Sequence, residues 1–204
     1  MEEHVSLSGT IDEKIITCLT AAGWYENRMV DITHVKAFYE SAGIKLSAGA
    51  EAFLSEFYGL AEYWYFNKDG KCKDRNGNPS WVSPDFEFRL FPLQGASDDY
   101  YTAEASTAEL TEEHRKAELF AKEPLVWIGE IGYYYTDNVY IGSTGKLYTA
   151  HDGNDTICCY DSLFEMLRQQ FRHAAAKWDY VCMRQSYETE TGTSPSLPIS
   201  PNRN

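Results

Sequence analysis

The sequence predicts an α+β domain, in which N-terminal helices pack on a mostly antiparallel sheet of about five or six strands and a helix follows near the C-terminus. Three observations favour this class. Apolar residues recur at helical spacing in the first 60 residues, strand-like segments separated by short turns follow, and helical spacing returns after residue 160. Strands joined by short hairpins pair antiparallel, so we expect one antiparallel sheet.

Three helices are expected in the N-terminal part of the chain. The first covers Ile11 to Ala22 and ends at Gly23, which can adopt the left-handed conformation that often follows a helix. The second covers Asp31 to Ala42 with Asp31 as its N-cap, and the third covers Ser47 to Tyr58. The apolar spacing predicts that their buried faces consist of Ile11, Ile15, Ile16, Leu19, Val35, Phe38, Tyr39, Ala50, Phe53, Leu54 and Phe57.

The middle of the chain is predicted to form the sheet. In the segment from Asp85 to Phe91, apolar and charged residues alternate, as they do in a half-buried strand. Asp137 and Asn138 are assigned to a turn between two strands. The other predicted strands are residues 63–66, 125–128, 133–135, 139–141, 146–149 and a short strand near Ile157.

Two later helices and a tail complete the prediction. A capping box of Ser106 and Glu109 is expected to start a helix that ends before Pro124, and Asp161 is expected to cap the last helix. From Ser186 onward, Ser, Thr, Pro, Gly and Asn dominate the composition. We therefore assign residues 1–185 to a single domain and residues 186–204 to a mobile tail.

The charge of the chain is strongly negative and unevenly spread. The formal net charge is −13, and the stretch from residue 98 to 165 contains 14 acidic residues against 4 basic ones. This acidity argues against nucleic acid or an anionic membrane as the direct partner, because phosphate groups are bound by Lys and Arg. Two interpretations remain: the charge keeps the protein soluble, or it attracts a basic partner.

The sequence contains no pattern of a catalytic, metal or cofactor site. A P-loop, a GxSxG motif and an HExxH motif are all absent, and the five cysteines include no CxxC pair. His151 beside Asp152 is interpreted as an ordinary surface turn rather than a catalytic pair. We expect no enzyme activity, metal or cofactor, and the absence of a signal peptide or membrane helix, together with reduced cysteines, predicts a cytoplasmic protein.

One segment carries more specific information. Gly23 ends the first helix, Trp24 follows at once, and Arg28 and Asp31 precede the second helix. We expect Trp24 to cover the seam between two helices and Arg28 either to bind carbonyl groups at a helix end or to pair with an acid. Further motif residues lie in and after the third helix: Phe53, Leu54 and Gly59.

This pattern resembles the third group of the SUKH superfamily of immunity proteins. Pro124, Gly129-Glu130, the hairpin segment from Gly145 to Tyr148 and the last helix are similar to later parts of the family pattern, although Tyr58 replaces the first glycine of a usual pair. The resemblance implies a bacterial protein that is encoded beside a secreted toxin and blocks it. Cognate toxins in this superfamily are often nucleases or deaminases, whose surfaces tend to be basic.

The resemblance directs the search for a toxin-binding surface to the acidic stretch, while the motif residues are expected to be structural. Charge and aromatic side chains are the criteria, because aromatic residues often anchor interfaces and charge accelerates association. Alternatives are a scaffold or regulatory SUKH protein that binds an endogenous partner, and an unrecognised enzyme. The candidate toxin-binding residues are Asp98, Asp99, Tyr100, Tyr101, Glu104, Asp137, Asp152 and Asp155.

Overall fold

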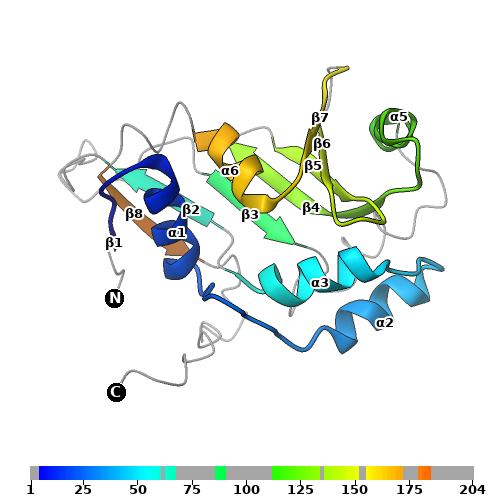
Figure 1. Cartoon of the computed structure of the whole chain (residues 1–204), viewed down its shortest axis with the longest axis horizontal. Helices are drawn as coiled ribbons and strands as arrows, with labels where there is room; N and C mark the ends of the chain where they lie inside the picture. Colours follow the sequence, from blue (N-terminus) through cyan, green and yellow to red (C-terminus); the bar gives the residue numbers. More distant parts are fainter. Residues whose placement is uncertain are drawn as a thin grey trace, which may run out of the picture.

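The computed structural model describes residues 5–60, 63–67, 86–90, 112–133, 136–151, 155–171 and 179–184. Figure 1 shows helices and a sheet in these ranges, which confirms the α+β class. The predicted tail and the predicted capping box of Ser106 and Glu109 lie outside the described residues. The helices are α1 (Ile11–Ala21), α2 (Thr33–Ser41), α3 (Ala48–Phe57), α5 (Glu112–Ala121) and α6 (Leu163–Phe171).

The described strands form one antiparallel sheet of eight strands rather than five or six. Their order across the sheet is β1-β8-β2-β3-β4-β5-β6-β7. The two strands that the sequence did not predict are β1 and β8, and β8 lies inside the sheet between β1 and β2. The strands are β1 (Val5–Ser6), β2 (Tyr63–Asn67), β3 (Phe86–Leu90), β4 (Val126–Tyr133), β5 (Asp137–Ile141), β6 (Leu147–His151), β7 (Ile157–Tyr160) and β8 (Tyr180–Arg184).

Strand β4 corrects the predicted meander. The sequence predicted separate strands at 125–128 and 133–135, but residues Val126–Tyr133 form one strand. The pairing register with β5 shifts between Trp127 and Gly129, so the strand continues through a bulge. The glycines that suggested an interruption are therefore accommodated inside the strand, because glycine tolerates the irregular backbone of a bulge.

Two further predictions about polar residues are wrong in detail. Asp137 and Asn138 are the first residues of β5 instead of a turn, and they pair with residues of β4. The last helix is capped by Ser162, whose hydroxyl accepts a hydrogen bond from the Glu165 backbone at 3.2 Å. Asp161, the predicted cap, instead forms an ion pair with Lys146 at 2.8 Å.

Helices cover both faces of the sheet. Helices α1, α3 and α6 share the main core with one face, where the rings of Trp64, Phe86 and Phe171 have centroids 5.0–5.8 Å apart. Helix α5 packs on the other face at the β5–β6 end, where Ala117 contacts a second cluster that includes Tyr140 and Tyr148. Alternate residues of β5 and β6 face these two clusters, as expected for a sheet covered on both sides.

The predicted buried faces of the N-terminal helices are largely confirmed. In α1, Ile15 and Leu19 are buried, whereas Ile16 is exposed because the packed face of this helix is narrow. In α3, the Ser47 hydroxyl accepts a hydrogen bond from Ala50 N at 3.1 Å, as predicted for the cap. The buried residues of α3 are those predicted: Ala50, Phe53, Leu54 and Phe57.

The β5–β6 hairpin docks on the first turn of α3. A Cβ atom added to Gly49 would lie 2.5 Å from the nitrogen of Gly145 and 2.9 Å from the carbonyl carbon of Thr144. The same turn is held from the other side, because the Ser143 nitrogen donates a hydrogen bond to the Glu123 carboxylate at 3.1 Å. The absence of a side chain at Gly49 therefore permits a backbone contact between helix and hairpin.

Candidate functional site

The segment between α1 and α2 is fixed to the C-terminal end of α3 by Arg28. Its guanidinium donates one hydrogen bond to the Glu56 carbonyl at 2.5 Å and one to the Tyr58 carbonyl at 2.7 Å. Carbonyl groups at the end of a helix lack intrahelical partners, and a guanidinium presents two donors in a fixed fork. Of the two roles that the sequence allowed for Arg28, the structure shows the one at the helix end. Burial lowers the pKa of Arg28.

Trp24 lies where three helices meet. Its indole nitrogen donates to a carboxylate oxygen of Glu56 on α3 at 3.1 Å, and its ring lies edge-on to Phe164 of α6 at 5.6 Å. Its backbone nitrogen donates to the Leu19 carbonyl of α1 at 2.8 Å. The chain can turn here because Gly23 has a φ of +106°, which side chains other than glycine rarely tolerate.

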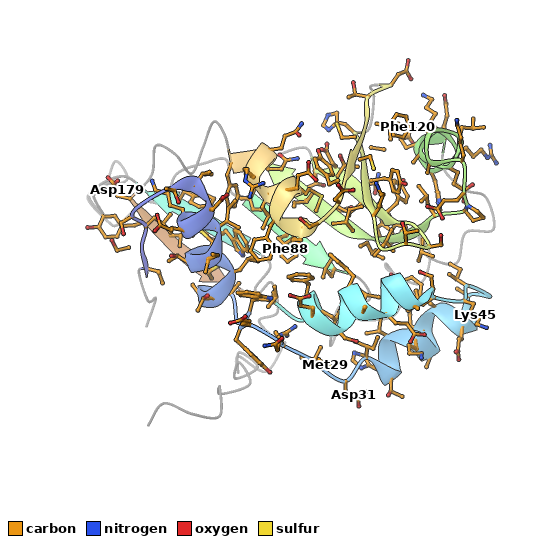
Figure 2. The ribbon with its side chains drawn as sticks, viewed as in Figure 1. Met29, Asp31, Lys45, Phe88, Phe120 and Asp179 are labelled. Carbon is orange, nitrogen blue, oxygen red and sulfur yellow. The ribbon has the colours of Figure 1, made fainter. Side chains whose placement is uncertain are left out.

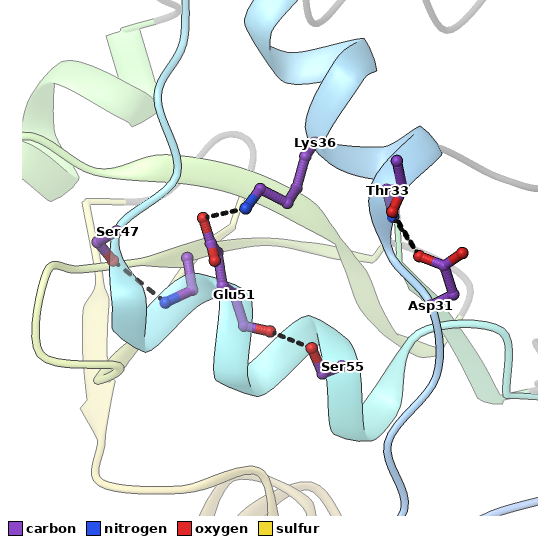
Figure 3. A network of polar contacts seen from close by, with 7 residues as sticks. Asp31, Thr33, Lys36, Ser47, Glu51 and Ser55 are labelled. Atoms are coloured by element: carbon purple, nitrogen blue, oxygen red, sulfur yellow. Dashed lines mark hydrogen bonds and ion pairs between the residues drawn. The ribbon is translucent and has the colours of Figure 1, made fainter.

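Asp31 acts before α2 rather than as its N-cap. The helix begins at Thr33, and Asp31 Oδ1 accepts hydrogen bonds from the Thr33 nitrogen at 2.9 Å and the Thr33 hydroxyl at 2.6 Å (Figure 3). The hydrogen bonds from the Thr33 hydroxyl and then the Thr33 nitrogen lower the pKa of Asp31. Figure 3 also shows the ion pair between Lys36 and Glu51, 2.9 Å apart, which joins α2 to α3.

The remaining motif residues lie in the core or support Arg28. Phe53 and Leu54 are buried in the main core cluster. Gly59 has a φ of +75°, and a Cβ atom placed there would lie 3.8 Å from an Arg28 nitrogen. The corner, defined as residues 23–31, is thus a rigid connection that α1, α3 and α6 hold in place.

The structure does not assemble the predicted acidic site. Asp137 and Asp155 lie in described parts of the chain, and each has a partner: Asp137 contacts His151 at 2.7 Å, and Asp155 contacts Lys116 of α5 at 2.7 Å. Asp137 also accepts a hydrogen bond from Gln170 of α6, so the two acids approach different helices on opposite faces of the sheet. The other candidates, Asp98, Asp99, Tyr100, Tyr101, Glu104 and Asp152, lie outside the described residues.

The contact between His151 and Asp137 is one that the sequence analysis missed. His151 ends β6 instead of lying in a turn, and it is the cross-strand partner of Asp137 in β5. The register of the hairpin contains the signal: Ile141 and Leu147 pair next to the Gly142–Lys146 turn, and continuing this pairing outward places Asp137 opposite His151. The prediction failed because it placed Asp137 in a turn and considered only Asp152, the neighbour in sequence.

The remaining groups of chemical interest in the described residues are the metal-ligating side chains and the buried cysteine. There, no three His, Cys, Asp or Glu side chains are grouped to hold a metal ion, and no helix has the length and apolarity needed to cross a membrane. Burial raises the pKa of the Cys18 thiol to about 12, so this thiol stays protonated and unreactive.

Comparison with known families identifies the chain. A model of the SUKH-3 immunity protein family matches residues 11–169, which is more than half of the sequence. The chain belongs to the SUKH-3 immunity protein family. No curated protein and no solved structure matches it.

Membership in SUKH-3 gives the chain an immunity function with a toxin as its partner, in a family that is generally not enzymatic. The match begins at the first residue of α1 and ends inside α6. It therefore includes the corner, α3 and the β5–β6 hairpin. Strands β1 and β8 lie outside the matched region, although β8 pairs with β2 inside the sheet.

Proposed function

We propose that this SUKH-3 protein neutralises a basic toxin domain that acts on nucleic acid, such as a nuclease or deaminase of a bacterial polymorphic toxin system. The observation that supports this proposal is the charge distribution. The chain has a net charge of −13, and residues 98–165 contain 14 acidic residues against 4 basic ones. An enzyme that binds polyanions needs a positive surface, and an acidic inhibitor can occupy that surface.

The acidic surplus persists when only described residues of this stretch are considered. Residues 112–133, 136–151 and 155–165 contain nine acidic residues and four basic residues. Long-range attraction depends on this summed charge, and it raises the association rate even where single carboxylates have local partners. We propose the cytoplasm as the place of encounter, in keeping with the free thiols of Cys18, Cys158 and Cys159 among the described residues.

A direct test needs the toxin domain, which we expect the gene adjacent to the one for this chain to encode. We expect the purified chain to abolish the nuclease or deaminase activity of that domain, and an unrelated protein of similar net charge to leave it intact. The association rate should fall steeply between about 50 and 200 mM salt, because ions screen the attraction. An association rate independent of salt, or a fully active toxin in the presence of the chain, would refute the proposal.

A further inference from the structure

Two large apolar side chains of the corner are exposed to solvent. Met29 exposes 81% of its surface and Tyr25 exposes 50%. Figure 2 shows Met29 and Asp31 near one another on the segment that leads into α2. A single exposed apolar residue is unremarkable, but two of them on one short, fixed segment suggest a contact surface.

The backbone between these two side chains is held rigidly. Arg28 lies between them in sequence but points inward, where it binds the Glu56 and Tyr58 carbonyls. Its backbone nitrogen donates to the Tyr25 carbonyl at 3.1 Å, which closes the turn that precedes Met29. Inward-pointing residues of the corner therefore fix its backbone, and its outward-pointing residues are exposed to solvent. A rigid display loses little conformational entropy when a partner binds.

The charge next to this apolar pair is negative. Glu26 and Asp31 are both exposed, whereas Arg28, the one basic residue between positions 23 and 31, is buried. The Asp31 carboxylate also accepts hydrogen bonds from the Thr33 nitrogen and hydroxyl, which fix its position next to the exposed pair. An apolar centre with a charged, hydrated rim is the usual anatomy of a protein interface, and acidic charges at the rim select a basic partner.

We propose that the outward side of the corner is the toxin-binding surface, with Tyr25 and Met29 as apolar anchors and Glu26 and Asp31 as charges that meet basic residues of the toxin. This inference rests on the proposed function and names the contact surface, whereas the acidic surplus of residues 98–165 contributes to the long-range attraction. Within the segment, Trp24 and Arg28 fix the backbone conformation, and the exposed side chains of the corner determine which toxin is bound.

A second exposed apolar pair provides a matched control. Leu119 and Phe120 of α5 expose 78% and 54% of their surface, close to the values for the corner pair. They lie on the helix that covers the opposite face of the sheet. Their helix carries Glu112, Glu113 and Glu118 against Arg115 and Lys116, so the control matches the corner in net charge as well as in exposure.

The experiment measures binding of the toxin domain encoded by the adjacent gene, purified in a catalytically inactive form. We expect Tyr25→Ala/Met29→Ala to raise the Kd about 30-fold or more, as for truncated interface anchors. The control Leu119→Ala/Phe120→Ala should change the Kd less than about threefold, as expected for a surface outside the interface. Both variants should keep a thermal unfolding midpoint close to that of the wild type, because the side chains they shorten are largely exposed; Phe120 loses only an edge-on contact with Tyr148 at 6.5 Å.

A charge reversal tests the same surface without removing an anchor. Glu26→Lys should lower the association rate about tenfold at low salt, whereas Glu112→Lys on α5 should lower it much less. A corner effect no larger than the α5 effect, in either experiment, would overturn this inference and leave the immunity function intact if the wild type still binds. Failure of the wild type to bind would overturn the proposed function as well. A change from dimer to monomer in sedimentation of the unbound corner variant would assign the surface to a second copy of the chain and would also overturn the inference.

Discussion

Arg28 offers a sharp test of how the corner is held. We consider Arg28→Ala, which removes both hydrogen-bond donors from the Glu56 and Tyr58 carbonyls, and Arg28→Lys, which keeps the charge. A lysine ammonium is a single point on a flexible chain and lacks the planar fork of arginine. The lysine variant should therefore replace one of the two contacts but not both.

The magnitude follows from the surroundings of the two carbonyl groups. A buried acceptor that loses its partner costs about 1–3 kcal/mol. The contact to Tyr58 is buried and the contact to Glu56 is partly buried, so water can replace the second one in part. The energy needed to bury the guanidinium offsets some of the gain. We expect Arg28→Ala to lower the free energy of unfolding by about 2–4 kcal/mol and Arg28→Lys by about half as much.

Urea denaturation of the wild type and both variants measures these differences, provided that unfolding is two-state. Arg168→Ala is a suitable control, because Arg168 forms an exposed ion pair with Asp12 at 2.7 Å. Such a pair contributes at most about 1 kcal/mol. If Arg28→Ala cost no more than Arg168→Ala, or if Arg28→Lys were as stable as the wild type, the argument from two buried carbonyl groups would be wrong.

Two further predictions concern other contacts. Gly49→Ala should destabilise the protein by about 1 kcal/mol or more in urea denaturation, because the new Cβ would collide with the backbone of the docked hairpin, although alanine is the better helix former. Ala48→Gly, at the exposed neighbouring position, measures the effect of helix propensity alone. A Gly49→Ala variant more stable than the wild type would contradict the contact. The lowered pKa of Asp31 stabilises the fold above the ordinary value of 3.8, and this contribution disappears as the pH falls through the lower pKa of the folded state. Asp31→Asn should therefore lose less stability than the wild type on acidification from about pH 5 to pH 2, measured by thermal unfolding, and equal losses would count against this account.

Most of the helices and most of the strands could be predicted from local pattern. The buried stripes of α3 and α6 and the alternation of β3 are visible in sequence because each element buries a single face, so its apolar residues recur with the period of the element. The corner was also identifiable, since a glycine that ends one helix and an acid that precedes the next are local signals.

Other features depended on pairings that no local pattern records. Strand β8 was missed because its partners, β1 and β2, come from the first third of the chain. The sequence also could not show that Asp137 and Asp155 lie apart. It gives the number of charges in a segment but not their contacts, in which Asp137 pairs with His151 and Asp155 with Lys116.

The sequence by itself determined the α+β class, the family resemblance and the acidic character of the chain, because composition and periodicity are properties of local segments. Only the tertiary structure decided which side of the corner faces the core. Arg28 turns inward because two carbonyl groups at the end of α3 lie within its reach, and Tyr25 and Met29 consequently point to solvent. That division arises from contacts between residues about thirty positions apart, and it makes a structural corner into a candidate binding surface.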